Sequence, residues 1–250
     1  MSKEKGKEQK ILKAQITYLD NSGFAVKTSG HFLIFDCWNM KATQGKKGLM
    51  GGAVDPAELA GENVVVFVSH AHGDHYSTGI FKWAGYIPNI RYIVSDDVRA
   101  PKEAYALKPH EAYDIDGIHI RTLRSTDEGV AFLVEVDGLH IYHAGDLNWW
   151  HWEGEDPRWN AKMGDDYKRE IDRLAKEKID IAFVPVDPRL ERDQLRGIAY
   201  FMETVDAKMV IPMHYGRDAT SAAHALEGAH IRHAGRVISP MQRGQTIGFE

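Results

Sequence analysis

The stretch Val64–Tyr76, VVVFVSHAHGDHY, indicates both a structural element and a chemistry. It begins with a continuous run of apolar, β-branched residues, Val64–Val68, which predicts a strand buried on both faces. Imidazole nitrogens and carboxylate oxygens suit zinc, manganese, iron or nickel, and the single cysteine, Cys37, cannot form a thiolate cage. A lone histidine at a strand end is usually only a hydrogen-bonded polar residue, but a cluster predicts a metal site. Its members fall within six residues after the strand: His70, His72, Asp74 and His75.

This H-x-H-x-D-H cluster at the end of a buried strand resembles the signature of the metallo-β-lactamase-fold metallohydrolases, and its four residues match that signature one by one. The resemblance extends from about Ile16 to the C-terminus. The short chain and its PMHYG ending look most like the branch that includes sugar-lactone hydrolases. The resemblance implies one or two divalent metal ions, zinc first, with manganese or iron as alternatives. It also implies that Asp36, at the end of an early strand, supports the site without binding metal.

A second match lies in the middle of the chain. Two apolar runs, Val130–Val136 and Leu139–His143, flank Asp137-Gly138, a strong two-residue hairpin signal. The second run leads into Ala144-Gly145-Asp146. In the family that we infer by resemblance, a Gly-Asp at this strand end supplies a ligand that bridges or completes the metal site, which here is Asp146.

A third match follows the predicted strand Lys208–Met213, which ends in His214. In the family, a P-x-H segment at this place supplies the last imidazole. The resemblance therefore implies a single metal centre, with Asp74 also orienting the attacking hydroxide. Its ligands would be His70, His72, Asp74, His75, Asp146 and His214.

One part of the family pattern is missing. The loop before the hairpin, Ser125–Gly129, has no histidine where the family usually has one, so the first of two ions lacks a ligand. Asp127 or Glu128 could substitute as an oxygen ligand, His151 could reach in from the later loop, or the site could hold one ion. We favour Asp127, because the hairpin brings the start of its first strand level with the end of its second.

The segment Asn148–Trp159, NWWHWEGEDPRW, contains four of the six tryptophans in a polar, loop-like stretch. Tryptophan is usually buried in the core, and a dimer contact is also ordinary. Because this segment directly follows Asp146, we predict that it walls the substrate pocket. The candidate substrate-binding residues are Trp150, His151 and Tyr215.

Strands and amphipathic helices alternate along the chain in two successive groups, which predicts two sheets face to face with helices outside. The expected architecture is a four-layer αββα sandwich of two mixed β-sheets, the metallo-β-lactamase fold, with a flexible tail at 1–10 and a single domain at 11–250. Expected strands lie at Ile11–Leu19, Phe24–Thr28, His31–Asp36, Val64–Val68, Arg91–Ser95, His119–Leu123, Val130–Val136, Leu139–His143, Ile179–Val186, Lys208–Met213, Val237–Ser239 and Thr246–Phe249. Expected helices lie at Ser77–Ala84, Gly164–Lys178, Leu195–Val205 and Arg217–Gly228.

The composition narrows the class of protein. The formal net charge of −5 offers no basic excess for binding nucleic acid. No apolar run approaches the ~20 residues that a membrane-spanning helix needs. One cysteine fits a reducing cytoplasm. We therefore expect a cytoplasmic protein with a small-molecule substrate and no nucleic-acid or membrane partner, and the composition leaves a homo-oligomer open.

The favoured function is a metal-dependent hydrolase in which a metal-bound hydroxide cleaves an ester-type bond: a lactone, a carboxylic ester or a phosphodiester. Two alternatives stay open at the level of the sequence. One is a non-catalytic metal-binding or sensing protein, which the missing histidine would permit. The other is an RNA-processing nuclease of the same fold, although such proteins usually carry an added RNA-binding domain that is not visible in this sequence.

Overall fold

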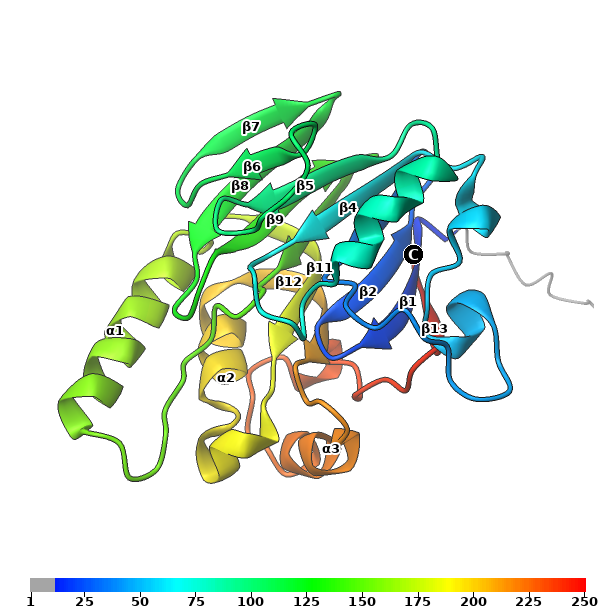
Figure 1. Ribbon diagram of the computed structural model, residues 1–250. Helices are drawn as coiled ribbons and strands as arrows, with labels where there is room; N and C mark the ends of the chain where they lie inside the picture. The colour runs from blue at the N-terminus through cyan, green and yellow to red at the C-terminus, as the bar shows by residue number, and fades with distance from the viewer. Residues whose placement is uncertain (1–11) are drawn as a thin grey trace, which may run out of the picture.

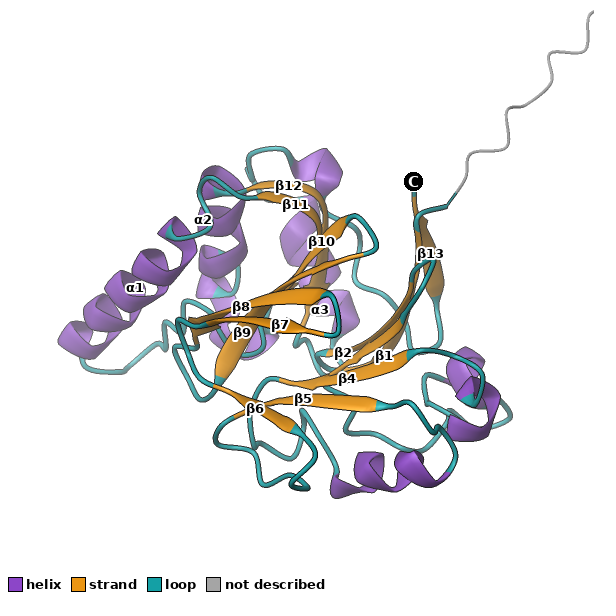
Figure 2. Ribbon diagram, turned by 90° about the horizontal axis from the view of Figure 1, so that it is seen from above, coloured by secondary structure: helices purple, strands orange, loops and turns teal. Residues whose placement is uncertain are grey.

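The structure, a computed structural model, describes residues 12–250, and the predicted N-terminal tail lies outside this range. Two mixed β-sheets pack face to face, with helices on their outer sides (Figures 1 and 2). The predicted four-layer architecture is therefore confirmed. The first sheet has the order β13 (Thr246–Phe249), β1 (Ala14–Asp20), β2 (Gly23–Lys27), β3 (Phe32–Phe35), β4 (Val64–Val68), β5 (Arg91–Ser95), β6 (Tyr105–Leu107). The second has the order β12 (Asp206–Met213), β11 (Lys178–Pro185), β10 (Leu139–His143), β9 (Val130–Val136), β8 (Ile118–Arg124), β7 (Ala112–Ile115).

Strand β4 lies inside the first sheet, parallel to both β3 and β5, and all five of its residues are buried. A strand covered on both faces needs the unbroken apolar run that the sequence shows. In the second sheet, β10, β11 and β12 are parallel to one another, while β9 pairs with β10 in the predicted antiparallel hairpin.

The main core fills the space between the sheets with aromatic side chains. Phe35 and Phe67 stack within the first sheet, with ring centroids 4.7 Å apart. From the second sheet, Phe132 meets Phe67 edge-on at 5.4 Å and Phe183 lies 4.2 Å from Phe24. These contacts hold the two sheets together, and with them the strand ends that carry the candidate ligands.

Three α-helices flank the second sheet, and some of the short 3-10 helices lie along the outer face of the first (Figure 2). Within residues 12–250, no helix has both the length and the apolar character that crossing a bilayer requires. The α-helices are α1 (Pro157–Asp172), α2 (Arg196–Thr204) and α3 (Ala219–Glu227). The 3-10 helices are η1 (Gly48–Gly51), η2 (Pro56–Leu59), η3 (Thr78–Gly85), η4 (Pro188–Asp193) and η5 (Ala234–Arg236).

The structure differs from the predicted elements in a few places. The helix expected at Gly164–Lys178 is α1, which begins at Pro157 and ends before β11. Its start carries a signal that the prediction overlooked, because Asp156 caps the helix and proline occupies its first position. Strands β6 and β7 were not predicted, and the strand expected at Val237–Ser239 is only an isolated bridge between Val210 and Val237.

Candidate metal centre

The predicted ligands come from strands of both sheets that end at one edge of the sandwich. His70, His72, Asp74 and His75 follow β4, Asp146 follows β10 and His214 follows β12. Their nitrogen and oxygen atoms form two compact groups, each with all its atoms within 4.8 Å of one another. The first group is His70, His72, Asp127 and Asp146; the second is Asp74, His75 and His214.

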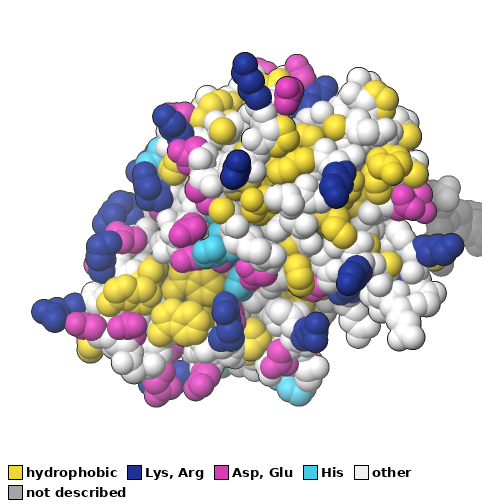
Figure 3. Space-filling view, in the orientation of Figure 1, with side chains coloured by type: hydrophobic (Ala, Val, Ile, Leu, Met, Phe, Trp, Pro, Cys, Tyr) yellow, Lys and Arg dark blue, Asp and Glu magenta, His cyan; other side chains and the backbone are white. Residues whose placement is uncertain are grey.

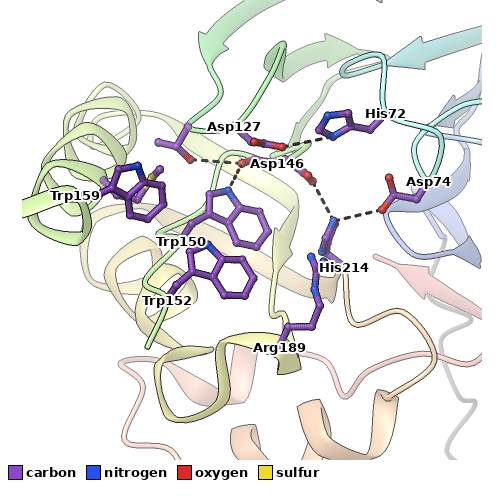
Figure 4. A pocket seen from close by; sticks show the side chains of 11 residues that line it. His72, Asp74, Asp127, Asp146, Trp150, Trp152, Trp159, Arg189 and His214 are labelled. Carbon is purple, nitrogen blue, oxygen red and sulfur yellow. Dashed lines mark hydrogen bonds and ion pairs between the residues drawn. The ribbon is translucent and has the colours of Figure 1, made fainter. Parts of the chain in front are cut away.

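In the first group, Asp127 stands where the family pattern would have a histidine. Its Oδ2 lies 3.5 Å from His72 Nδ1 (Figure 4). In the same group, His70 Nε2 lies 3.7 Å from Asp146 Oδ2. Burial, and then the neighbouring Asp146 carboxylate, raise the pKa of Asp127. A cation between the two carboxylates would relieve this repulsion.

The second group meets the first at Asp146. Asp146 Oδ1 lies 3.1 Å from His75 Nε2 and 3.3 Å from His214 Nε2, and its Oδ2 faces His70. Although burial alone raises the pKa of Asp146, the His214 and His75 imidazoles outweigh burial and hold this pKa well below its usual value. One carboxylate thus faces both groups, which is the arrangement that a bridging ligand requires.

Buried carboxylates hold two of these histidines from behind. His75 Nδ1 lies 2.8 Å from Asp36 Oδ2, and His214 Nδ1 lies 3.2 Å from Asp187 Oδ2. Such contacts fix the ring so that the opposite nitrogen points into the site. The placement of Asp36 agrees with the supporting role that the resemblance implied. Asp187 lies two residues after the end of β11, and no supporting role was predicted for it from the sequence.

Four of the polar atoms that face this centre are buried and have no hydrogen-bond partner among residues 12–250. Leaving a buried polar atom unpaired costs about 1–3 kcal/mol each. These imidazole nitrogens and carboxylate oxygens are the donors that zinc, manganese and iron accept, so the residues fit a divalent metal. The atoms are His70 Nε2, His75 Nε2, His214 Nε2 and Asp146 Oδ1.

Burial and charge separate the histidines into two kinds. Burial lowers the pKa of His70 to about 4, so its ring is neutral and ready to donate a lone pair. Burial alone would also lower the pKa of His75 and of His214, but nearby carboxylates have the larger effect. For His75, the carboxylates of Asp146 and Asp36 outweigh burial and raise its pKa well above the usual value. For His214, Asp146 and Asp187 raise the pKa to about 9.

The loop that carries Asp127 is fixed to the first sheet. The Val130 amide donates to the Ser69 carbonyl over 2.9 Å, directly beside His70. Gly129 has a positive φ of 69°, and a Cβ on it would lie 2.0 Å from the same carbonyl oxygen. Only glycine allows this close approach, and the approach brings Asp127 to His72.

The structure places the three candidate substrate-binding residues in different surroundings. His151 belongs to neither group, and its Nε2 lies 3.9 Å from Asp193 Oδ2. Tyr215 directly follows His214 and lines a hollow beside it, although its side chain is mostly buried and its hydroxyl donates to the Met241 carbonyl over 2.8 Å. Trp150 is also mostly buried, and its indole N–H donates to the Asp146 carbonyl over 3.0 Å.

A hollow of about 330 Å³ opens beside the ligands, within the range typical of small-molecule sites. Figure 3 shows apolar side chains gathered beside histidines on this face of the molecule, and Figure 4 shows Trp150 next to Asp146 and His214. The predicted aromatic segment therefore lies at the centre, although His151 does not line the hollow. Its apolar wall consists of Trp150, Trp152, Trp159 and Met163.

Sequence reasoning missed several residues in or next to this hollow, Thr126 among them. Arg189 lines it from η4, and Met163 lines it from α1. Asn21, in the turn between β1 and β2, donates from Nδ2 to Asp74 Oδ2 over 3.1 Å. The Asp-Pro-Arg after the predicted strand at 179–186 was the only signal for Arg189, and nothing in the sequence pointed to Asn21.

Together, the two-sheet sandwich and the paired His/Asp groups at its edge define a hydrolase of the metallo-β-lactamase fold. Residues 15–151, more than half of the chain, match the family described as Beta-lactamase superfamily domain. The chain belongs to this family, which confirms the resemblance seen in the sequence.

Known proteins agree with this assignment. A UPF0173 metal-dependent hydrolase of Korarchaeum cryptofilum is 25% identical over 80% of this chain and 82% of that protein. Another, from Thermococcus kodakarensis, is 26% identical over 80% of this chain and 84% of its own length. Among solved structures, Igni18, a metallo hydrolase from Ignicoccus hospitalis, covers 95% of this chain and 98% of its own, with a TM-score of 0.63 and 18% identity. This last likeness concerns the fold.

Proposed function

We propose that the protein is a metal-dependent hydrolase that binds two divalent ions and cleaves an ester-type bond in a small molecule: a lactone, a carboxylic ester or a phosphodiester. The observation that carries the proposal is the set of buried, unpartnered nitrogen and oxygen atoms that converge at the edge of the sandwich. The relatives named metal-dependent hydrolase support it. The proposed ligands are His70, His72, Asp127 and Asp146 for one ion, and Asp74, His75, His214 and the shared Asp146 for the other.

A divalent ion in such a site lowers the pKa of a water molecule from ~15.7 to about 7 and polarises the bond that is attacked. The remaining work falls to side chains of this chain. Asp74 is half exposed beside the hollow, and Asn21 fixes its Oδ2 by a hydrogen bond of 3.1 Å. The Asp74 carboxylate can therefore accept a proton from the attacking water and orient it towards the substrate.

The surroundings of the ligands limit their motion. The Asp36 and Asp187 carboxylates hold the imidazoles of His75 and His214 from the outer side. The Trp150 indole holds the backbone of Asp146 and also lies edge-on to the His214 ring, with ring centroids 5.5 Å apart. A site held in this way needs little rearrangement when charge develops during the reaction.

The experiment has two arms. Metal content is measured on the purified protein and after reconstitution with zinc, manganese or iron. Each form is then tested on a lactone, a carboxylic ester and a phosphodiester, beside Asp74→Ala and beside Asp206→Ala, a surface control whose carboxylate pairs with Arg236 outside both hollows that adjoin His214. We expect turnover that depends on metal and is lost only in Asp74→Ala. Full turnover by the chelator-treated protein would contradict the proposal.

A further inference from the structure

The most distinctive unassigned feature is the wall of the hollow rather than its metal ligands. Trp150 and Trp152 lie nearly parallel, with an interplanar angle of 4° and ring centroids 6.1 Å apart. Trp159, at the start of α1, is 39% exposed, although water-exposed tryptophan has an apolar surface that favours burial. Three indoles and a methionine beside a polar centre form a surface suited to a flat apolar group.

Arg189 adds a fixed positive charge to this wall. Its Nε donates to Asp187 Oδ2 over 2.9 Å, and its Nη2 donates to the same carboxylate. Asp187 is itself buried and held by His214, so the guanidinium has a firm support. On the other side, Arg189 Cζ lies 5.8 Å from the centre of the Trp152 ring.

The contacts of Arg189 with Asp187 and Trp152 leave one nitrogen of the guanidinium, Nη1, available to a ligand. The hydrogen bonds of the Arg189 side chain to residues 12–250 come from Nε and Nη2, and its Nη1 group makes none. The side chain is 65% exposed and lines the hollow beside Asp74 and His214. An arginine held on one edge with free N–H groups on the other is well suited to a carboxylate or phosphate.

A second hollow of about 600 Å³, which no tryptophan lines, shares the residues Asp74, Arg189 and His214 with the first. It is lined in addition by Asn21 and Arg217, among others. A molecule that crosses the metal centre would thus meet tryptophans on one side and the Asn21 and Arg217 side chains on the other. Arg189 stands at the boundary between them.

From this arrangement we infer that the substrate carries a flat apolar group, which packs against Trp152 and Trp159, and an anionic group, which binds Arg189. This inference rests on the proposed function and names the substrate class of the same site. Arg189 and the indoles are specificity-determining residues in this assignment. Neither is a metal ligand.

Ligand binding tests the inference without any turnover. The probes are 2-naphthoate, which has both features, 2-naphthalenemethanol, which has the ring alone, and acetate, which has the charge alone. Dissociation constants are measured by titration calorimetry on the zinc-loaded full-length protein. We expect 2-naphthoate to bind roughly tenfold or more tightly than either partial probe, as one charged hydrogen-bonding contact predicts.

Matched variants assign the two contacts. Arg189→Gln should abolish the preference for 2-naphthoate over 2-naphthalenemethanol, and Arg189→Lys should retain part of it. Arg192→Gln is the control, because Arg192 lies on the same η4 segment but pairs with Glu153 outside both hollows. Trp159→Ala should weaken both aromatic probes about equally, whereas Trp159→Phe, which keeps a flat ring, should restore most of the binding.

The ratio of two dissociation constants is insensitive to a fraction of misfolded protein, so a poorly folded variant does not obscure the result. A preference for 2-naphthoate that survives Arg189→Gln would mean that the metal holds the carboxylate, and it would overturn the role of Arg189. Binding of 2-naphthoate no tighter than that of acetate would overturn the aromatic contact. Tight, Arg189-dependent binding with no metal-dependent turnover would instead contradict the proposed function and leave this inference standing.

Discussion

His75 Nδ1 lies 2.8 Å from Asp36 Oδ2, and both side chains are buried. Asp36 also accepts hydrogen bonds from the Ser69 amide and hydroxyl, over 2.8 and 2.7 Å. The carboxylate therefore joins the end of β3 to the turn that begins the ligand cluster. Because the contact uses Nδ1, it leaves His75 Nε2 facing Asp146 at 3.1 Å.

Asp36→Asn should weaken metal binding by about 10–100-fold, because an amide no longer fixes the His75 ring or increases its basicity. Competition with a chelating dye under native conditions measures the affinity. Asp180→Asn is the control, since Asp180 is also buried but pairs with Lys208. Equal affinities in the two variants would show that Asp36 serves the fold alone.

Asp127→Ala should reduce the bound metal from two equivalents to one, because it removes the carboxylate of the first group that lies 3.5 Å from His72 Nδ1 and leaves that ion one ligand short. Metal analysis after dialysis measures the stoichiometry. Glu128→Ala and His151→Ala are the controls. Glu128 is the next residue in the loop, with Oε2 3.5 Å from His72 Nε2, and it belongs to neither group. Loss of an equivalent in a control instead of Asp127→Ala would transfer the ligand role to that residue.

The thermal stability of the metal-free protein should fall as pH rises from about 6.5, the usual histidine value, towards 9. Burial acts to lower the pKa of His214, but Asp146 and Asp187 raise it to about 9 in the folded state. His75 shifts upward in the same way, through Asp146 and Asp36. A group whose pKa is raised by folding stabilises the fold fully below its unfolded pKa, and this contribution is lost as pH rises through the folded pKa.

His70 has the opposite sign. Because burial lowers its pKa to about 4, its protonation in the unfolded chain opposes folding as pH falls below about 6.5. The prediction is tested by measuring the melting temperature of chelator-treated protein at several pH values between about 5 and about 9. Asp146→Asn should flatten the alkaline part of the curve. A melting temperature that rises between pH 6.5 and 9 would contradict these assignments.

Gly129→Ala should destabilise the protein by more than 1 kcal/mol, on the order of the cost of a strained backbone. Its Cβ would lie 2.0 Å from the Ser69 carbonyl oxygen at a positive φ. The loop must then shift, so metal affinity at the first group should fall as well. Gly117→Ala is a matched control, because Gly117 also has a positive φ, of 81°, but has open space around it. Denaturant unfolding with metal titration distinguishes the two variants.

Trp150→Ala should lower both the melting temperature and kcat/KM. The indole is mostly buried and its N–H holds the Asp146 backbone, so its removal costs about 3–5 kcal/mol, as large core truncations do. Trp159→Ala, at a far more exposed position, should leave the melting temperature nearly unchanged. Thermal melts and steady-state kinetics on both variants separate core packing from substrate contact.

Much of the fold could be predicted from local patterns. The buried run that became β4 and the Asp137-Gly138 turn between β9 and β10 both carry strong signals, and both elements have the expected bounds. Strands β6 and β7 were missed because they are short, of three and four residues, and lie mostly exposed at sheet edges. Such strands depend on their neighbours for pairing, so their sequences show little alternation.

For the candidate site, the sequence predicted the residues at strand ends and missed those that reach in from elsewhere. Asp146 and His214 each follow a strand directly, so their convergence follows from sheet topology. Asn21 comes from a turn about fifty residues before Asp74, the residue it contacts, and no local pattern encodes such a meeting. Arg189 was missed for another reason: its backbone and guanidinium are both held by Asp187, which caps η4, and the sequence does not show which way such a capped residue points.

The hairpin of β9 and β10 sets the spacing between Asp127 and Asp146, because one carboxylate precedes it and the other follows it. In this hairpin, His143 pairs with Phe132 at the end near the candidate metal centre, and Leu139 pairs with Val136 at the opposite end, next to the turn. Removing one residue from each strand at the turn would shorten this ribbon symmetrically and leave both carboxylates in place. Deleting a single residue from one strand would turn every later side chain to the opposite face. At the Asp137-Gly138 end, the hairpin therefore tolerates insertions or deletions only when β9 and β10 change by the same number of residues. This constraint applies to natural variants and to engineered ones.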